Sequence, residues 1–221
     1  MSFFMNDNTG SAFTGRVEDI RFVSGHGQFT ADIVPANALH AVFFRSPVAA
    51  GMITGLDCNA AKAVTGVVAV LTAADAAADG VANMIWTGGP VREDGGVTVD
   101  SPRPLLSGAE IRHLGEPVAM VIATSRQAAA DAAELIDLQI EAADSVALSV
   151  ENMLDGPLVW PGTTDNIASL HRQGNRDDVD AILAKSAHVS HFEFDISKIT
   201  ACTMEMRTSI GFIDENGKSC V

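Results

Sequence analysis

The sequence predicts an α+β fold, and three short stretches carry that prediction. Residues 116–123 form a nearly continuous apolar run, typical of a strand that is covered on both faces. Residues 136–141 alternate apolar with polar side chains, which indicates a half-exposed strand. Between them one apolar face repeats at helical spacing, formed by Ala129, Ala132, Ala133 and Ile136. We therefore expect a strand–helix–strand unit within a mixed sheet, right-handed if its strands are parallel.

The residues before this unit predict further strands and short helices. Apolar, β-branched runs predict strands over 38–45, 51–56 and 67–71. Pro47 ends the first strand, because proline has no N–H to donate. Asp57 is expected to cap a helix over residues 59–64, which Gly66 ends, and Thr72 a helix over residues 73–78. Residues 79–108 then form a long loop, rich in glycine and proline, of a kind that is usually functional.

The last third of the chain predicts fewer elements. Residues 149–173 look like a connection, and Asn175 is expected to cap a helix over residues 176–187 with an apolar face of Val179, Ile182 and Leu183. Strands are expected over 191–196 and, interrupted near Glu205, over 199–213. Residues 214–217 read as a hairpin turn, with only four residues after it. The fold is therefore expected to be unfinished at Val221.

Composition excludes several classes of protein. The chain has 221 residues, of which 47% are hydrophobic and 19% charged, so it has enough apolar residues for a core. A net charge of −14 argues against nucleic-acid binding, which rewards clustered Lys and Arg. Its cysteines, Cys58, Cys202 and Cys220, form no CxxC pair. We expect reduced thiols, a cytoplasmic protein, and neither a signal peptide nor a membrane span.

Several residues are candidates for chemistry, and each has a simpler structural interpretation. His188 and His191 could share a helical face and bind a metal, but a surface pair is favoured. The adjacent carboxylates Glu93 and Asp94 could act as acid and base, but in a glycine-rich loop they are expected to be solvated. Ser46 lies in no GxSxG motif.

The remaining candidates lie in or beside apolar segments. Cys58 begins a helix, where a thiolate would be stabilised, but a small buried residue is the preferred interpretation. His40 and His113 are expected to be core histidines. Arg45 ends its strand and either pairs with a carboxylate there or faces a partner subunit. These residues make no complete active site.

The order of several motifs carries a resemblance to a known family. GRVEDIRFVSGHGQFTADI (residues 15–33), LHAVFFRSP (39–47), LDCNAAKAVTGVVAVLTAAD (56–75) and HLGEPVAMVIATSRQAAADAAELI (113–136) follow one another in register. This resembles the α/β hammerhead domain at the front of the large, molybdenum-binding subunit of the xanthine dehydrogenase/aldehyde oxidase family. The likeness continues at residues 173–187 and in TMEMR (203–207).

The chain also departs from the family's pattern at several positions. Residues 48–51 contain no histidine, Thr65 stands in place of a proline, and the chain has no tyrosine. Asn175 replaces an aspartate, and Thr203 and Met206 replace two prolines. These departures leave the substrate open.

The resemblance implies a domain order: residues 1–14 a flexible arm, 15–145 the hammerhead domain, 146–172 a connection, and 173–221 the incomplete start of the molybdopterin-binding domain. It implies a molybdopterin-type molybdenum cofactor in the parent enzyme, not bound by this chain alone. Iron–sulfur clusters and FAD would sit on partner subunits of a heteromer. None of the matched positions is a catalytic, cofactor-binding or metal-binding residue of the family.

Two functions from different classes follow. The first is the front of a molybdenum hydroxylase large subunit, an oxidoreductase that hydroxylates an aldehyde, an N-heterocycle or a similar small substrate with oxygen from water. The chain alone would then be an inactive scaffold that contacts the rest of the large subunit and the iron–sulfur and flavin subunits. The second is a stand-alone interaction or assembly module without activity. A third interpretation, an unrelated α+β enzyme using residues 79–108, has less support.

Overall fold

The computed structural model describes residues 16, 18–84, 102–146, 154–168, 173–194, 196–197, 199–205 and 207–221. The chain divides into two compact units, one of residues 37–191 and one that joins residues 1–36 with residues 192–221. No helix in the described residues is long and apolar enough to cross a membrane.

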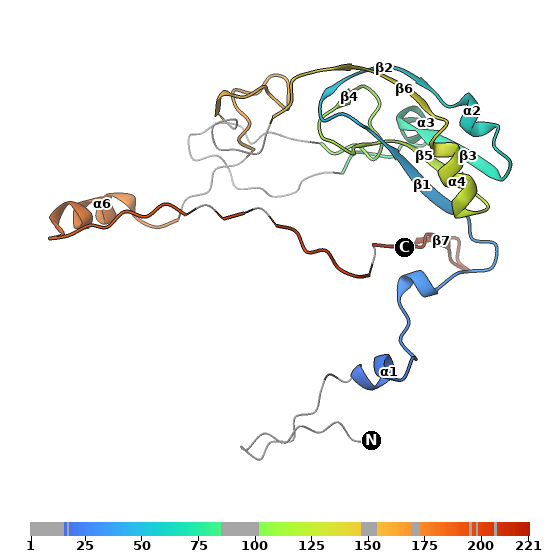
Figure 1. Ribbon diagram of the computed structural model, residues 1–221, viewed down its shortest axis with the longest axis horizontal. Helices are drawn as coiled ribbons and strands as arrows, with labels where there is room; N and C mark the ends of the chain where they lie inside the picture. The colour runs from blue at the N-terminus through green and yellow to red at the C-terminus, as the bar shows by residue number, and fades with distance from the viewer. Residues whose placement is uncertain are drawn as a thin grey trace. The chain divides into compact units, whose positions relative to one another are not determined.

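The core of the larger unit is built around one buried strand. Strand β5 (Pro117–Ala123) lies between β1 (His40–Arg45) and β3 (Val67–Thr72), and it pairs antiparallel with both (Figure 1). Val121 lies opposite Val42 on one side and Val70 on the other. Side chains at four positions of β5 have no exposed surface: Val118, Ala119, Val121 and Ala123. The continuous apolar run thus becomes a central strand, as predicted, but only the face that carries Ala119, Val121 and Ala123 is wholly buried, whereas Met120 and Ile122 on the other face are half-buried.

A helix rich in alanine covers this sheet. Helix α4 (Arg126–Ala133) begins where the Ser125 Oγ accepts a hydrogen bond of 3.1 Å from the backbone N–H of Ala128, which confirms the predicted cap. Ala129 and Ala132 are fully buried in the core cluster. Because alanine has the smallest apolar side chain, the helix lies close to β1 and β5. The short α2 (Asn59–Lys62) adds Ala61 to the same core.

A second sheet holds the other half of the predicted unit. Strand β2 (Gly51–Asp57) lies between β4 (Glu110–Ile111) and β6 (Asp137–Ala142), again with antiparallel pairing. The strand–helix–strand unit β5–α4–β6 therefore forms, but its strands belong to different sheets, and the expectation of a mixed sheet was wrong for the described residues. A Cβ at Gly51 would lie 2.6 Å from the backbone oxygen of Glu141, so β2 and β6 approach too closely there for any larger residue.

Of two short helices with predicted caps, one begins at its predicted cap. Helix α3 (Ala73–Ala78) has Thr72 as its N-cap, and the backbone N–H and the hydroxyl of Thr72 both donate to the Asp75 Oδ2 at 2.7 Å. Helix α2 instead has Cys58 as its N-cap, one residue after the predicted Asp57, and ends at Lys62; the Asp57 Oδ1 still accepts from the backbone N–H of Asn59 at 2.8 Å. In the smaller unit, α1 (Asp19–Val23) and the 3-10 helix η1 (Thr30–Asp32) were not predicted.

Helix α6 (Arg176–Lys185) forms as predicted, but none of the described residues buries it. The Asn175 Oδ1 accepts from the backbone N–H of Asp178 at 3.3 Å, which confirms the predicted cap. No residue of the helix is buried, and its apolar face is exposed at Val179, Ile182 and Leu183. The pattern was sufficient to identify the helix, whereas burial also needs a surface to pack against.

The smaller unit ends in a hairpin. Strand β7 (Phe212–Ile213) pairs antiparallel with β8 (Ser219–Cys220), and between them the Asp214 Oδ1 accepts from the backbone N–H groups of Asn216 and Lys218. The predicted turn is therefore confirmed, and β7 is what the described residues retain of the strand predicted over 199–213.

The strand predicted over 191–196 is wrong. Its described residues belong to no ladder, and three large side chains are 72%, 79% and 86% exposed: Phe192, Phe194 and Ile196. Alternation marks a sequence that suits a strand, but a ladder also requires a neighbouring strand.

Candidate functional site

A groove with a volume of about 670 Å³ lies beside the end of β1 in the larger unit. Its lining comes from β1, from Met84 and from residues 102–105, 112–113, 116–117 and 159–160. Three arginines line it, and we call it the arginine groove: Arg45, Arg103 and Arg112. This is an unusual concentration of positive charge in a chain with a net charge of −14.

Arg45 is held by a backbone carbonyl and an aromatic ring. Its Nη1 donates to the carbonyl oxygen of Gly115 at 2.9 Å, and its guanidinium carbon lies 5.6 Å from the ring centre of Phe43. Phe43 and Arg45 lie on the same exposed face of β1, because side chains alternate along a strand. The sequence left two roles open for Arg45, pairing with a carboxylate or facing a partner subunit. No carboxylate of the described residues pairs with it.

The turn after β1 is fixed by Ser46. This residue is buried, and its backbone N–H donates to the carbonyl oxygen of Glu116 at 2.9 Å. Its hydroxyl donates to the carbonyl oxygen of Val48 at 2.8 Å and accepts from the N–H of the same residue at 3.1 Å. Ser46 therefore organises the turn, and Gly115 completes it by donating its N–H to the Ser46 carbonyl.

Glu116 is the buried charged residue of the site, with 4% of its surface exposed. Its Oε2 accepts a hydrogen bond of 2.6 Å from the backbone N–H of Arg112 and lies 3.6 Å from the Nδ1 of His113. A buried carboxylate is costly unless it is hydrogen-bonded, and this bond also closes the chain over residues 112–116. Glu116 thereby fixes the wall of the groove that carries Arg112.

Arg112 is positioned by a carboxylate on one side and an indole on the other. Its Nη2 lies 2.5 Å from the Oε2 of Glu110, and its guanidinium carbon lies 4.1 Å from the ring centre of Trp160. Its Nε is buried and has no hydrogen-bond partner among the described residues. A buried donor without an acceptor is uncommon in folded proteins, so this atom is a polar position that the described part of the chain leaves unsatisfied.

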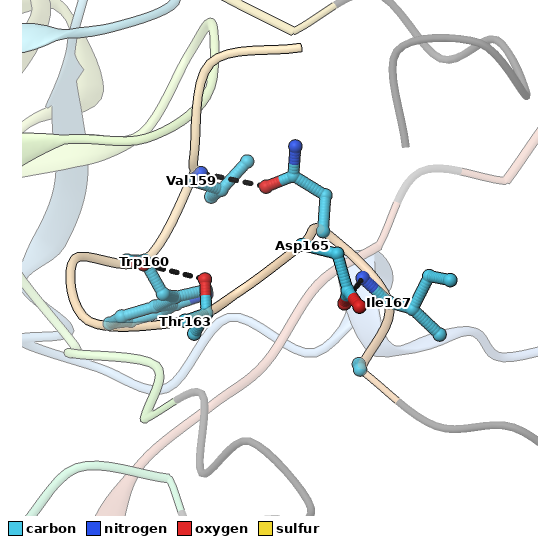
Figure 2. Close-up of a pocket in the computed structure, with 7 residues that line it drawn as sticks. Val159, Trp160, Thr163, Asp165 and Ile167 are labelled. Carbon is cyan, nitrogen blue, oxygen red and sulfur yellow. Dashed lines mark hydrogen bonds between the residues drawn. The ribbon is translucent and has the colours of Figure 1, made fainter. Parts of the chain in front are cut away.

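Trp160 is presented by a loop that is bonded to itself (Figure 2). The backbone N–H of Val159 donates to the Asn166 Oδ1 at 2.9 Å, and the Thr163 hydroxyl donates to the Trp160 carbonyl at 2.9 Å. The N–H of Ile167 donates to the Asp165 Oδ1. A small pocket of about 170 Å³ lies within this loop. The loop therefore supports the ring on which Arg112 is stacked.

The histidine candidates lie in different places. His113 was expected in the core, but its side chain is 65% exposed and lines the groove, because the loop before β5 turns it outward. His40 is half-buried in β1. His188 and His191 are exposed, and the Nε2 of His188 lies 3.1 Å from the Ser190 hydroxyl. Across the described residues, no three His, Cys, Asp or Glu side chains lie close enough together to hold a metal ion.

Two other candidates remain. Cys58 is buried at the start of α2, and this burial raises the pKa of its thiol, so it is not an activated thiolate. Glu93 and Asp94 lie outside the described residues.

Sequence reasoning missed Arg103, Arg112, Glu116 and Trp160. One signal was available: Glu116 opens an otherwise apolar run, and a charge at the start of a buried strand requires a partner. The contact between Arg112 and Trp160 had no such signal, because 47 intervening residues include the whole of β5, α4 and β6.

The chain matches one family model across its folded core. Residues 24–144 match the model described as aldehyde oxidase and xanthine dehydrogenase, a/b hammerhead domain. The chain belongs to this family. Its two antiparallel sheets with α4 are the hammerhead domain of that family, and the resemblance drawn from the sequence is confirmed.

Named relatives extend the likeness beyond this domain. The nicotine 6-hydroxylase large subunit of Paenarthrobacter nicotinovorans is 32% identical over 192 residues, which cover 87% of this chain and 23% of that protein. Quinoline 2-oxidoreductase from Pseudomonas putida 86 superimposes with a TM-score of 0.64 at 31% identity, over 78% of this chain and 21% of that one. A Cu,Mo-CO dehydrogenase superimposes with a TM-score of 0.63 at 29% identity, over 79% of this chain and 22% of that one. The chain therefore spans about a quarter of the relatives that it matches.

The arginine groove does not fit a molybdenum cofactor. A pterin cofactor of this kind carries negative charge and needs several backbone N–H donors converging on it. The groove has positive charge, but Pro102, Pro104 and Pro117 supply no N–H there, so no chemical step is assigned to it.

Proposed function

We propose that this chain is the front part of the large subunit of a molybdenum hydroxylase, and that it acts there as a scaffold. The parent enzyme would hydroxylate an aldehyde, an N-heterocycle or a similar small substrate with oxygen from water. The molybdopterin cofactor would be held by further polypeptide, and iron–sulfur and flavin subunits would accept the electrons. Support comes from the family match together with relatives that are large subunits or molybdenum enzymes by name.

One observation supports the scaffold role: apolar side chains are buried in the hammerhead core but exposed in the segment from α6 onward. The hammerhead core has fully buried residues in β5 and α4, so it is complete by itself. By contrast, α6 has no buried residue, and Phe192, Phe194 and Ile196 are exposed. Such apolar surface is stabilised when further protein covers it. We propose that residues 173–221 begin the next domain, after a connection at 146–172, with the hammerhead domain at 15–145 and an arm at 1–14.

The test is to purify the protein from the cells that make it. We expect it to co-purify with the remaining large-subunit polypeptide and with flavin and iron–sulfur subunits from the cytoplasm, and we expect molybdenum at about one atom per assembly by metal analysis. The alternative is an assembly module without activity, and it rests on the complete hammerhead core. Metal-free protein without these partners, from cells that make the cofactor, would favour the alternative.

A further inference from the structure

Two cations of the arginine groove, Arg45 and Arg103, have no carboxylate partner among the described residues. The Arg45 guanidinium contacts a carbonyl oxygen and the Phe43 ring, and the backbone of Arg103 forms hydrogen bonds with Met84. Arg112, by contrast, forms an ion pair with Glu110. The described residues therefore leave the positive charge of Arg45 and Arg103 available for a ligand.

The groove is prepared for binding before a ligand arrives. Arg45 is tied to Gly115, and Arg112 is held between Glu110 and Trp160. Side chains that are already ordered lose less entropy when they bind, which increases affinity. The carboxylate within the groove, that of Glu116, is buried and already accepts a hydrogen bond, so it repels an incoming anion less than an exposed one would.

The remaining lining suits an extended peptide more than a small molecule. Phe43, Pro102, Pro104 and Trp160 provide apolar surface around the cations. Aromatic and proline side chains are features of grooves with which proteins bind extended segments.

We propose that the arginine groove is a docking site for an extended acidic peptide segment, whose carboxylates pair with Arg45 and Arg103 while its apolar side chains pack on Phe43 and the prolines. The segment belongs to another polypeptide of the assembly. This inference rests on the contacts of the groove and does not depend on the molybdenum chemistry proposed above.

The probe is a capped hexapeptide in which glutamate alternates with leucine, and its matched control has glutamine in place of glutamate. Trp160 reports binding by its fluorescence in the full chain carrying Trp86→Phe, since the sequence has two tryptophans. We expect the acidic peptide to bind and its affinity to fall as NaCl is raised from about 20 to 300 mM, because salt screens exposed charges.

Charge-reversal variants distinguish binding in the groove from non-specific electrostatic attraction to the protein. Arg45→Glu and Arg103→Glu should each weaken binding about tenfold or more, whereas Arg126→Glu, the same charge change on an exposed residue of α4, should change it less than about twofold. Arg103→Glu keeps the test valid if Arg45→Glu disturbs the turn at Gly115, because the exposed Arg103 side chain forms no hydrogen bond or ion pair with a described residue. Circular dichroism checks each fold.

Four results would overturn the proposal. The first is equal binding of the glutamine peptide, and the second is unchanged affinity in both groove variants. The third is competition by free glutarate at concentrations as low as those of the peptide, which would make the groove a site for small carboxylates. A dimer of the free chain that Arg103→Glu dissociates would likewise assign the groove to a second copy. None of these results bears on the molybdenum content of the parent assembly, so the two proposals fail separately.

Discussion

The guanidinium carbon of Arg112 lies 4.1 Å from the ring centre of Trp160, and this contact joins two parts of the chain that are separated by a strand, a helix and a strand. The contact is a cation–π interaction between a side chain fixed by Glu110 and a ring fixed by its own loop. It joins residues 154–168 to the hammerhead core, although that segment lies entirely beyond the family match.

We expect Trp160→Leu to lower the free energy of unfolding by about 1 kcal/mol, since it removes the ring on which Arg112 is stacked. Trp160→Phe, which keeps an aromatic face, should cost less. Urea unfolding followed by circular dichroism measures both. Equal stability of Trp160→Leu and the unmodified chain would show that the contact contributes nothing to folding.

Glu116→Ala should destabilise the chain by about 1–3 kcal/mol, because the backbone N–H of Arg112 loses its acceptor in a buried place. Glu116→Gln keeps a carbonyl oxygen at the same position, and it should recover part of the loss. The measurement is the midpoint of urea unfolding at neutral pH. If the alanine and glutamine variants were equally stable, the hydrogen bond would not be the source of the effect.

Asp75 predicts a pH dependence of stability. Hydrogen bonds from the Thr72 hydroxyl and from its backbone N–H lower the pKa of this carboxyl. A lowered pKa in the folded state means that the stabilisation is present above the unfolded pKa and is lost as pH falls through the folded pKa. Asp75→Asn should therefore lower the Tm at pH 7, and the difference should shrink below about pH 4.

The matched control for this prediction is Asp79→Asn. Asp79 follows the end of α3, and its carboxylate accepts no hydrogen bond from a described residue. The Tm of the Asp79→Asn variant should therefore follow that of the unmodified chain across the same pH range. A constant difference between Asp75→Asn and the unmodified chain from pH 7 to pH 3 would contradict the capping role.

The cysteines should differ in reactivity. Cys58 is buried, and burial raises the pKa of its thiol, whereas Cys202 is exposed. Because the thiolate is the reactive form, a disulfide reagent such as DTNB at pH 8 should label Cys202 first and Cys58 only after unfolding. The Cys58→Ala variant should lack the slow phase of labelling, which assigns that phase to Cys58. Labelling of Cys58 at the rate of Cys202 would show that the core around α2 opens readily.

The sequence predicted local elements well and their partners poorly. Ser125 and Asn175 cap their helices as expected, because a cap depends on residues only three positions apart. The alternation in residues 192–196 also has a local cause, but a strand there needs a neighbour that the described residues do not supply. The same reason explains the assignment of β5 and β6 to different sheets, since the order of strands depends on the whole core.

The candidate site was less predictable than the fold. Arg45 was identified because it ends an apolar strand at a Ser-Pro turn. Its position in a groove with Arg103 and Arg112 depends on the chain's return through residues 102–117, and periodicity carries no information about that return. His113 was misplaced because it was judged by its apolar neighbours, whereas the turn at Gly115 directs it toward solvent.

Hydrogen exchange across residues 176–204 tests the central claim most directly, that this chain is a complete hammerhead core followed by a segment which requires further protein to fold. In the isolated chain we expect slow exchange in β5 and α4 and fast exchange in α6 and residues 192–204. In the assembly purified from its own cells, α6 and residues 192–204 should become protected. Equal protection of this segment in the isolated chain and in the assembly would contradict the account.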